Sequence, residues 1–488
     1  MKLIKSQFIR MLVCVMASTV LLSGAPGTYA DTGNGGGDNQ ALRKIGHIIV
    51  IYQENWSFDS LYGQFPGVNG LANAFDTLPQ LDKNTNYTSY IYQTPQAKNN
   101  GAPDVRFPPA NGHPALPLIP YNFTDFAGVD QKTGDIIHRF YHEQLQIDNG
   151  VLEPSAGSMD KFVTWSDNGG LVLSYVNATD LPEGKLAQKY VICDNFFHSA
   201  YGGSFLNHQY LVAATAPAWN QALPASNPNF VSNWNPATKA LNDGNLTFDG
   251  KFAVNTTFTV NTPHPSTTPA DQLMLNLSNP TIGDRLSDKH VSWKWYSGGW
   301  NDAVAGHADP LFQYHHQPLA YFQNYADGTP GRAAHLKDEQ DFFGDLTAGT
   351  LPAVSFIKPL GPDNEHPGYA DLQRGQQHVA DLVNAVKNSQ YWKDCAIIIT
   401  YDENGGRWDH VMPPPMPDGW GLGTRVPAII VSPFAKRGFV DSTPYETVSI
   451  LKFIEHRFDL PPLAVRDANS SVNDLSNAFS FSDDHDGH

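Results

Sequence analysis

The chain has 488 residues, of which 41% are hydrophobic and 16% are charged, and its formal net charge is −17. A hydrophobic fraction of this size supports a packed core and argues against an intrinsically disordered chain. The acidic balance argues against nucleic acid and anionic membrane surfaces as partners, because both present phosphates that Lys and Arg must neutralise.

The first 30 residues have the pattern of a secretory signal peptide. Three cations precede an apolar run over 11–22, and small residues then lead to a cleavage site after Ala30. The run of about 12 residues is short for crossing a bilayer, and no later stretch qualifies as a span. A buried N-terminal helix is the alternative. We therefore expect a secreted or periplasmic protein with a flexible leader over 31–44.

Short apolar runs follow, each typical of a buried strand, and helical patterns stand between several of them. The apolar runs lie at 45–52, 190–193, 291–296, 353–357, 396–401 and 428–431. Apolar residues recur at helical spacing over 376–386, and 443–446 has the form of a capping box with proline at the first helical position. Short strands that alternate with helices predict an α/β fold with a mainly parallel central sheet and helices on both faces.

A single domain is expected over 45–465. The stretches near 77–135 and 215–280 are rich in Pro, Asn and Thr, and they predict long insertions into this domain. The last residues, 466–488, predict an acidic tail, whose His and Asp content is more typical of a solvated terminus than of a metal site.

Two cysteines, Cys193 and Cys395, lie beyond the predicted cleavage site. Cys193 ends one predicted strand and Cys395 begins another, so in a parallel sheet they would lie roughly 15–20 Å apart at about 3.3 Å per residue. A disulfide needs Cα atoms within about 7 Å of each other. We therefore expect two buried free thiols, with a disulfide as the alternative.

Polar clusters follow several of the predicted strands. Because the carboxyl ends of parallel strands meet at one edge of a sheet, ligands bind there. Glu54 and Asn55 follow the first strand, and Asp402 and Glu403 follow the fifth. These side chains offer oxygen ligands, which hard divalent cations prefer, although a nearby histidine could shift the preference toward zinc or iron. The alternative for Asp402 and Glu403 is an ordinary strand-end turn.

Ser204 follows two glycines and begins a predicted helix. A hydroxyl at this place faces the positive end of the helix dipole, where free N–H groups can hold an anion. Beside a metal ion the hydroxyl can be ionised and become a nucleophile. The alternative is an ordinary N-cap serine.

Histidines form the third group of candidates. His315 and His316 lie in a Tyr-His-His-Gln-Pro loop, and His366 lies in Asn-Glu-His-Pro. His138 and His142 stand four residues apart and share one face if the segment is helical. We expect one of this last pair to face the active site, and a second metal bound by both is the alternative.

In combination, these motifs resemble those of the bacterial acid phosphatase and phospholipase C phosphoesterases, a family allied to the alkaline phosphatase superfamily. The opening motif Glu-Asn-x-Ser-Phe-Asp lies at 54–59, and Asp-Asn-x-Phe lies at 194–197. Asn-Glu-His-Pro-Gly lies at 364–368, and Tyr-Asp-Glu-Asn-x-Gly…Asp-His lies at 401–410. The resemblance runs from about 45 to 479 and implies an alkaline phosphatase-like fold.

The resemblance also implies roles for individual residues. One divalent metal, of open identity, would be held by Glu54, Asn55, Ser204, Asp402 and Glu403. The residues around the phosphoryl group would be His138, His315, His316 and His366, with Ser204 as the nucleophile. Trp56, Ser60 and His208 depart from the common motifs, and with Gly-Gly-Ser these departures favour the acid phosphatase branch.

We therefore expect a secreted, metal-dependent hydrolase of phosphoric esters, most consistent with an acid phosphatase that acts on phosphomonoesters through a serine nucleophile. A phospholipase C that cleaves phosphatidylcholine-type phosphodiesters is the first alternative, and an inactive secreted binding protein is the second. The expected partners are small phosphate esters or phospholipid head groups, without nucleic acid and without a stable membrane span. The sequence leaves the oligomeric state open.

Overall fold

The structure of the protein is a computed structural model. It describes residues 40–77, 80–81, 90–91, 101–107, 116–148, 152 and 159–481. The predicted signal peptide, the first part of the predicted leader and residues 482–488 of the predicted tail lie outside the described residues.

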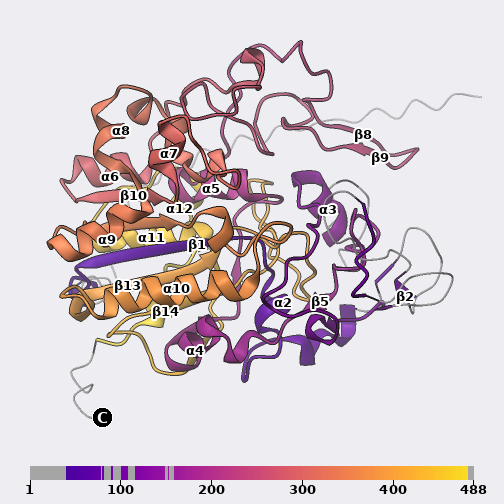
Figure 1. Cartoon of the computed structure of the whole chain (residues 1–488), viewed down its shortest axis with the longest axis horizontal. Helices are drawn as coiled ribbons and strands as arrows, with labels where there is room; N and C mark the ends of the chain where they lie inside the picture. The colour runs from indigo at the N-terminus through magenta and orange to yellow at the C-terminus, as the bar shows by residue number, and fades with distance from the viewer. Residues whose placement is uncertain are drawn as a thin grey trace, which may run out of the picture.

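An eight-stranded sheet forms the centre of the molecule (Figure 1). Its strands, in spatial order, are β11 (Leu336–Asp338), β10 (Trp293–Ser297), β12 (Val354–Lys358), β1 (His47–Gln53), β13 (Cys395–Tyr401), β14 (Ala428–Val431), β6 (Val191–Cys193) and β15 (Phe439–Asp441). Each neighbouring pair is parallel except the two that β14 forms with β13 and β6, which are antiparallel. The predicted α/β fold with a mainly parallel sheet is confirmed.

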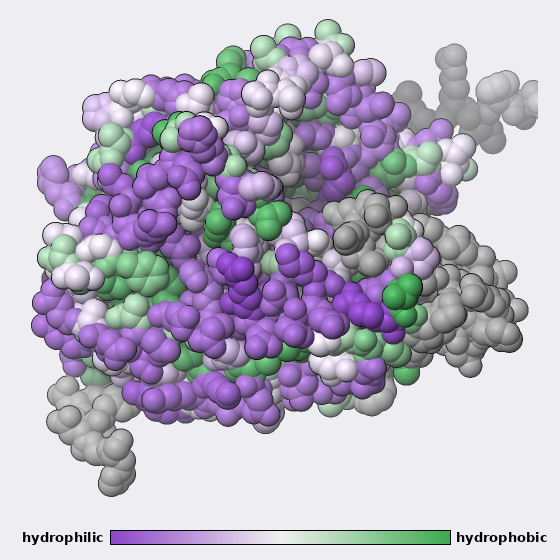
Figure 2. Space-filling model, in the orientation of Figure 1, coloured by the Kyte–Doolittle hydropathy of each residue, from purple (hydrophilic) through white to green (hydrophobic). Residues whose placement is uncertain are grey.

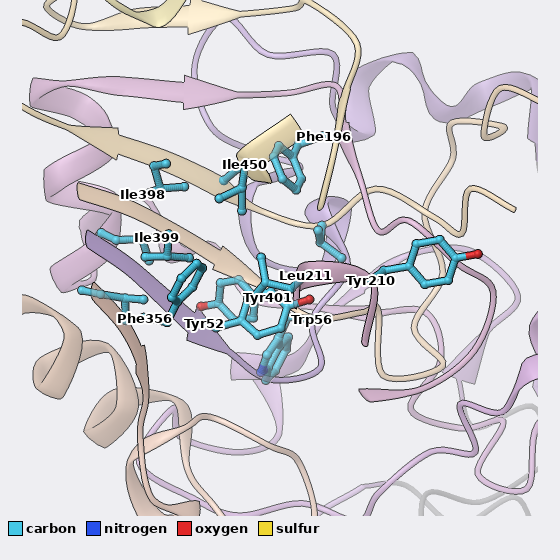
Figure 3. Close-up of a cluster of buried hydrophobic side chains, with 14 of the residues drawn as sticks. Tyr52, Trp56, Phe196, Tyr210, Leu211, Phe356, Ile398, Ile399, Tyr401 and Ile450 are labelled. Carbon is cyan, nitrogen blue, oxygen red and sulfur yellow. The ribbon is translucent and has the colours of Figure 1, made fainter. Parts of the chain in front are cut away.

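The two central strands, β1 and β13, are buried almost from end to end, so both faces of the sheet are covered. This burial explains why their sequences are continuous apolar runs without polar alternation. Ile49 pairs with Ile397 and Gln53 with Tyr401, so the two strands end at the same level. Figure 3 shows Tyr52 and Tyr401 in the apolar cluster at these strand ends. The residues that follow β1 and β13 therefore meet at one edge of the sheet.

Two pairs of helices pack closely against one another. α4 (Pro182–Lys189) packs on α10 (Leu372–Lys387), and α5 (Ser204–Ala213) packs on α11 (Thr447–Phe458). α10 buries an apolar stripe that includes Val379 and Leu382, as its helical spacing predicts. The other helices are α2 (Phe58–Tyr62), α3 (Phe140–Ile147), α6 (Ile282–Asp288), α7 (Trp300–Val304), α8 (Pro330–His335), α9 (Glu339–Ala348) and α12 (Val465–Ala468).

The predicted insertions carry little regular structure among their described residues. The strands outside the central sheet are β2 (Tyr90–Ile91), β3 (Leu116–Pro117), β4 (Tyr121–Asn122), β5 (Ser174–Tyr175), β7 (Phe196–Phe197), β8 (Asn233–Asn235), β9 (Ala240–Asn242) and β16 (Tyr445–Glu446). The hairpin of β8 and β9 extends at the upper right of Figure 1. Most of the described surface in that view is hydrophilic (Figure 2).

The predicted start of α11 is wrong. The helix begins at Thr447, with Glu446 as its N-cap, and the expected capping box over 443–446 does not form. Tyr445 instead pairs with Phe196 between β16 and β7, which keeps the backbone extended up to Glu446. Tertiary pairing therefore overrides the local helix signal at this point.

The predicted tail begins later than expected. Arg466 is buried and lies 3.2 Å from the carboxylate of Glu446, and the ring of Phe479 stacks on that of Phe453. Residues 466–481 are thus part of the folded body and do not form a tail. The predicted leader also ends earlier, because Leu42 is buried in the core.

Cys193 and Cys395 are both buried and free, which confirms the expectation of two unpaired thiols. They lie in different strands, and β14 separates β13 from β6 in the sheet. Within the described part of the chain, no helix combines the length and the apolar character needed to cross a membrane.

Candidate active site

Polar side chains from three strands gather at the carboxyl-end edge of the sheet. Glu54 and Asn55 directly follow β1, and Asp402 and Glu403 directly follow β13. Lys358 is the last residue of β12, the neighbour of β1 on its other side. All five side chains are buried, with at most 1% of their surface exposed. The parallel register of β12, β1 and β13 is what brings them together.

Ser204 joins this group from the N-terminus of α5. Gly203 is the N-cap, so Ser204 is the first helical residue, and the alternative of an ordinary N-cap serine is wrong. Gly202 has a φ of +86°, and a Cβ there would lie 2.5 Å from the Phe140 backbone, so the turn needs glycine. The turn places Ser204 Oγ 3.5 Å from Glu403 Oε1.

Asp402 ties the two central strand ends together. Its Oδ1 accepts hydrogen bonds from the backbone N–H of Asn55 at 3.3 Å and of Glu403 at 2.8 Å. Asn55 has a φ of +70°, in the left-handed region that asparagine tolerates better than most residues. Its side chain then lies 3.3 Å from His138 Nε2. The strained backbone at Asn55 therefore directs the Asn55 side chain toward His138.

The gathered oxygens fit a hard divalent cation. Asn55 Oδ1 and Asp402 Oδ2 are buried and accept no hydrogen bond from the described residues. Burial and the nearby Glu54 raise the pKa of Asp402 to about 7. Burial and Asp402 likewise raise the pKa of Glu403 well above its usual range. Buried carboxylates crowded in this way are costly unless a cation lies among them, and an oxygen donor set is typical of Mg²⁺, Mn²⁺ or Ca²⁺.

Glu54 differs from the other acids because it already has basic neighbours. Its Oε1 lies 2.5 Å from Lys358 Nζ and 2.6 Å from His316 Nε2. Burial would raise the pKa of Glu54, but these two neighbours outweigh it and hold the pKa well below its usual range. Burial also lowers the pKa of His316 to about 4. His316 is therefore neutral near pH 7, and Lys358 is the cation that balances Glu54.

Lys358 and His208 belong to the site, although the sequence analysis gave neither of them a role. His208 lies one helical turn after Ser204, its Nδ1 is 2.7 Å from the Ser204 carbonyl oxygen, and its ring stacks on His316. Glu54, His208 and His316 offer ligand atoms within 4.8 Å of one another, so this region is a further candidate metal cluster. The signal for Lys358 was present, because it ends a predicted strand at the same edge of the sheet.

A cavity of about 410 Å³ opens beside Ser204. His138, His315 and His366 line it, as the sequence analysis expects for residues around a phosphoryl group. His366 Nε2 lies 3.9 Å from Glu54, and His138 Nε2 lies 3.7 Å from Glu403. His316 lies behind Glu54, so within the pair 315–316 only His315 lines the cavity. The structure thus brings every predicted site residue to one region.

The expected helical relation between His138 and His142 is absent. α3 begins at Phe140, so His138 precedes the helix and does not share its face with His142. His142 Nδ1 lies 3.1 Å from Asp243 instead. The alternative of a second metal bound by these two histidines is therefore wrong.

Asp409 and His410, at the end of the motif at 401–410, belong to a buried cluster of ion pairs with Asp59 and Arg425. Arg425 Nε lies 2.9 Å from Asp409, and Arg425 also lies 3.0 Å from Asp59. His410 Nδ1 lies 2.6 Å from the other oxygen of Asp59. Asp59, Asp409 and His410 offer ligand atoms close enough together to hold a metal ion, but the Arg425 guanidinium already supplies positive charge beside the two carboxylates. The cluster fixes α2 to the loop after β13.

A buried pair of acids supports the loop that carries His366. Tyr401 Oη donates a hydrogen bond to Glu365 at 2.6 Å and lies 3.2 Å from Glu183. Glu365 has a φ of +74°, which turns the backbone just before His366. Burial raises the pKa of Glu365 to about 7, and burial together with Glu365 raises the pKa of Glu183 well above its usual range. The pair therefore holds protons at a pH where ordinary glutamates are ionised.

We predict that the free energy of unfolding falls as the pH rises from about 5 to 7. In this window the folded chain keeps a proton at Glu365 that the unfolded chain releases, so higher pH favours unfolding. Glu183→Gln removes a neighbouring carboxylate and should reduce the fall, by on the order of 1–2 kcal/mol. Urea unfolding of the purified protein across this range measures it.

The matched control is Asp381→Asn on the exposed side of α10, which should keep the wild-type pH dependence. The same slope in Glu183→Gln and in wild type would show that the two buried acids do not share protons.

Comparison with known proteins gives a consistent result. A family model described as "Phosphoesterase family" matches residues 45–461. The non-hemolytic phospholipase C of Pseudomonas aeruginosa is 23% identical, over 90% of this chain and 58% of that protein. Phospholipase C B of Mycobacterium tuberculosis is 25% identical, over 90% of this chain and 78% of that protein. The chain thus spans less than two thirds of the Pseudomonas relative.

Solved structures are more distant. A protein in the alkaline phosphatase superfamily from Vibrio parahaemolyticus is 11% identical, with a TM-score of 0.33 over 60% of this chain and 63% of that chain. The phosphonate monoester hydrolase of Silicibacter pomeroyi is 12% identical, with a TM-score of 0.33 over 63% of this chain and 73% of that chain. Likeness at this level carries no argument about the site.

Proposed function

The chain belongs to the phosphoesterase family, and on that premise we propose that it hydrolyses phosphoric esters with Ser204 as the nucleophile. One observation carries the proposal: the Ser204 hydroxyl lies 3.5 Å from Glu403, on the wall of the cavity that His138, His315 and His366 also line. A hydroxyl at a helix N-terminus, beside crowded carboxylates and histidines, is suited to accept and release a phosphoryl group.

We assign one divalent ion to the oxygens of the site. The residues that would hold it are Glu54, Asn55, Ser204, Asp402 and Glu403. When bound, such an ion lowers the pKa of a hydroxyl and neutralises charge on phosphoryl oxygens. Protein groups perform the nucleophilic attack and the protonation of the leaving oxygen.

In the proposed reaction, Ser204 Oγ attacks phosphorus in line with the leaving oxygen. The Oγ–P bond forms while the bond from phosphorus to the leaving oxygen breaks, and the hydroxyl proton passes to solvent. N–H groups at the start of α5 donate toward the phosphoryl oxygens. His366 protonates the leaving oxygen. Water then attacks phosphorus and gives a proton to His366, while the P–Oγ bond breaks and Ser204 Oγ takes a proton from solvent.

For the substrate we propose a phosphodiester of the phospholipid type, the alternative reading of the sequence. The two phospholipase C relatives, each aligned over 90% of this chain, support it. Trp56 and Ser60, two of the residues that depart from the common motifs and favour the acid phosphatase branch, do not line the cavity at Ser204. Trp56 is buried with Arg407 packed 4.0 Å from its ring centre, and Ser60 Oγ donates to the Ser57 carbonyl oxygen. A phosphomonoesterase is the second candidate, because the Gly-Gly-Ser204 turn favours that branch.

Two nitrophenyl esters separate the candidates. We expect a kcat/KM at least about tenfold higher for nitrophenyl phosphocholine than for nitrophenyl phosphate, which corresponds to about 1.4 kcal/mol. A reversed ratio would support the phosphomonoesterase, and turnover of neither ester would support the inactive binding protein.

We also propose that the protein is exported after cleavage of the predicted signal peptide. The protein recovered outside the cytoplasm should begin at Asp31. Protein that stays in the cytoplasm with an intact N-terminus would contradict export.

A further inference from the structure

A second cavity adjoins the one at Ser204. Its volume is about 620 Å³, within the range of small-molecule sites. Ile137 and Asp167 line both cavities, so the two share a wall. Leu81, Trp165 and Leu241 also line the second cavity. A substrate too large for the first cavity would therefore reach the second cavity over Ile137 and Asp167.

The walls of the second cavity come from segments far apart in the sequence, and hydrogen bonds hold several of them. Ile137 N donates to Asp167 Oδ1 at 2.8 Å, which fixes the shared wall. Thr164 Oγ1 donates to the Leu81 carbonyl oxygen at 2.7 Å. Ile137, Trp165 and Leu241 are only half-buried. The cavity is therefore a built feature of the fold.

The two cavities differ in chemistry. Ionisable side chains such as Glu54, His138 and His366 line the first, as a phosphoryl group requires. The second has a larger apolar than polar lining, and the ammonium group of Lys161 lies 2.8 Å from the carboxylate of Asp148. A paired cation has little charge left for an anion. His142 and Lys239 also line this cavity, so the part suited to hydrocarbon is the apolar wall of Leu81, Ile137, Trp165 and Leu241.

We propose that the second cavity binds the apolar leaving group of the substrate, the acylglycerol part of a phospholipid, while the phosphoryl group lies beside Ser204. This inference rests on the proposed phosphodiester hydrolysis. Its residues are Leu81, Ile137, Trp165 and Leu241, whose side chains would cover the first methylenes of an acyl chain. Burial of those methylenes favours binding of the leaving group in the second cavity. An apolar alcohol is therefore preferred over a polar one as the leaving group.

A chain-length series tests the inference. Diacyl phosphocholines with acyl chains of increasing length, used as monomers, share one phosphoryl group and differ only in the leaving group. For wild type, kcat/KM should rise by roughly threefold to fourfold for each methylene that enters the cavity. In Trp165→Ser and Leu241→Asn the rise should be flattened, while the shortest ester changes by less than about threefold. Leu275→Asn is the control, because Leu275 is 52% exposed and lies outside the cavity.

The outcomes are distinguishable. Turnover of no ester by wild type contradicts the proposed function itself. Turnover of all esters with no dependence on chain length, or with the wild-type dependence in both cavity variants, overturns the inference alone. Calorimetry of a short-chain diacylglycerol with Ser204→Ala protein measures binding without turnover. We expect the double variant Ser204→Ala/Leu241→Asn to bind this diacylglycerol more weakly than Ser204→Ala. Equal binding by the two variants would contradict the cavity assignment.

Discussion

Ser204→Ala is expected to lower kcat/KM for nitrophenyl phosphocholine by at least about a thousandfold, because the first bond to phosphorus would be made by the missing oxygen. The fold should persist. The printed hydrogen bond of the side chain is long, 3.5 Å to Glu403, and its other polar neighbour is Asp402, so the free energy of unfolding should change by less than about 1 kcal/mol. Steady-state kinetics and urea unfolding of the same preparation measure both quantities.

Ser204→Thr is the matched control, because it keeps a hydroxyl at the same place and should retain measurable turnover. Acid quenching of wild type during turnover should trap a phosphoryl group on the peptide that contains Ser204. Activity in Ser204→Ala within tenfold of wild type would exclude the nucleophile role.

Asp402→Asn is expected to separate activity from stability. Asparagine keeps the shape of Asp402 but removes one of the crowded buried charges, so divalent metal binding and turnover should both fall by at least about a thousandfold. The chelated variant should nevertheless be more stable than chelated wild type above pH 7, by about 1–2 kcal/mol. The sign follows from the raised pKa of Asp402: its ionisation above pH 7 burdens the folded state alone.

Metal content by elemental analysis and thermal unfolding with and without chelator measure the two effects. Asp381→Asn, the exposed control, should change neither. A variant Asp402→Asn that keeps wild-type metal content contradicts the assignment of this carboxylate as a metal ligand. A variant that is less stable than wild type in chelator contradicts the account of a costly buried charge at Asp402.

The site could be placed from the sequence because strand ends are encoded locally. β1 and β13 are continuous apolar runs, each followed at once by Glu54-Asn55 or Asp402-Glu403, and a parallel sheet brings such ends together. The position of Ser204 at the start of α5 could be predicted in a similar way, from two glycines followed by a helical pattern. These features depend on neighbouring residues, so a sequence reveals them.

What the sequence missed depends on contacts between distant segments. Lys358 ends a predicted strand at the same edge of the sheet, but its contact with Glu54 requires that β12 and β1 be neighbours, although 304 positions separate the two residues in the sequence. His208 joins the site through its stacking on His316. The late start of α11 has the same cause, because β16 pairs with β7 and holds Tyr445 extended. Local propensity does not encode any of these pairings.

The central claim is that oxygens from β1, β13 and α5 hold a divalent ion next to Ser204. An anomalous-scattering map from a crystal soaked in Mn²⁺ tests it directly. We predict one peak at about 2.0–2.6 Å from oxygens of Glu54, Asn55, Asp402 and Glu403, with Ser204 Oγ at the same site. A peak on Asp59 and Asp409 instead, or no peak near Ser204 at saturating Mn²⁺, would contradict the claim.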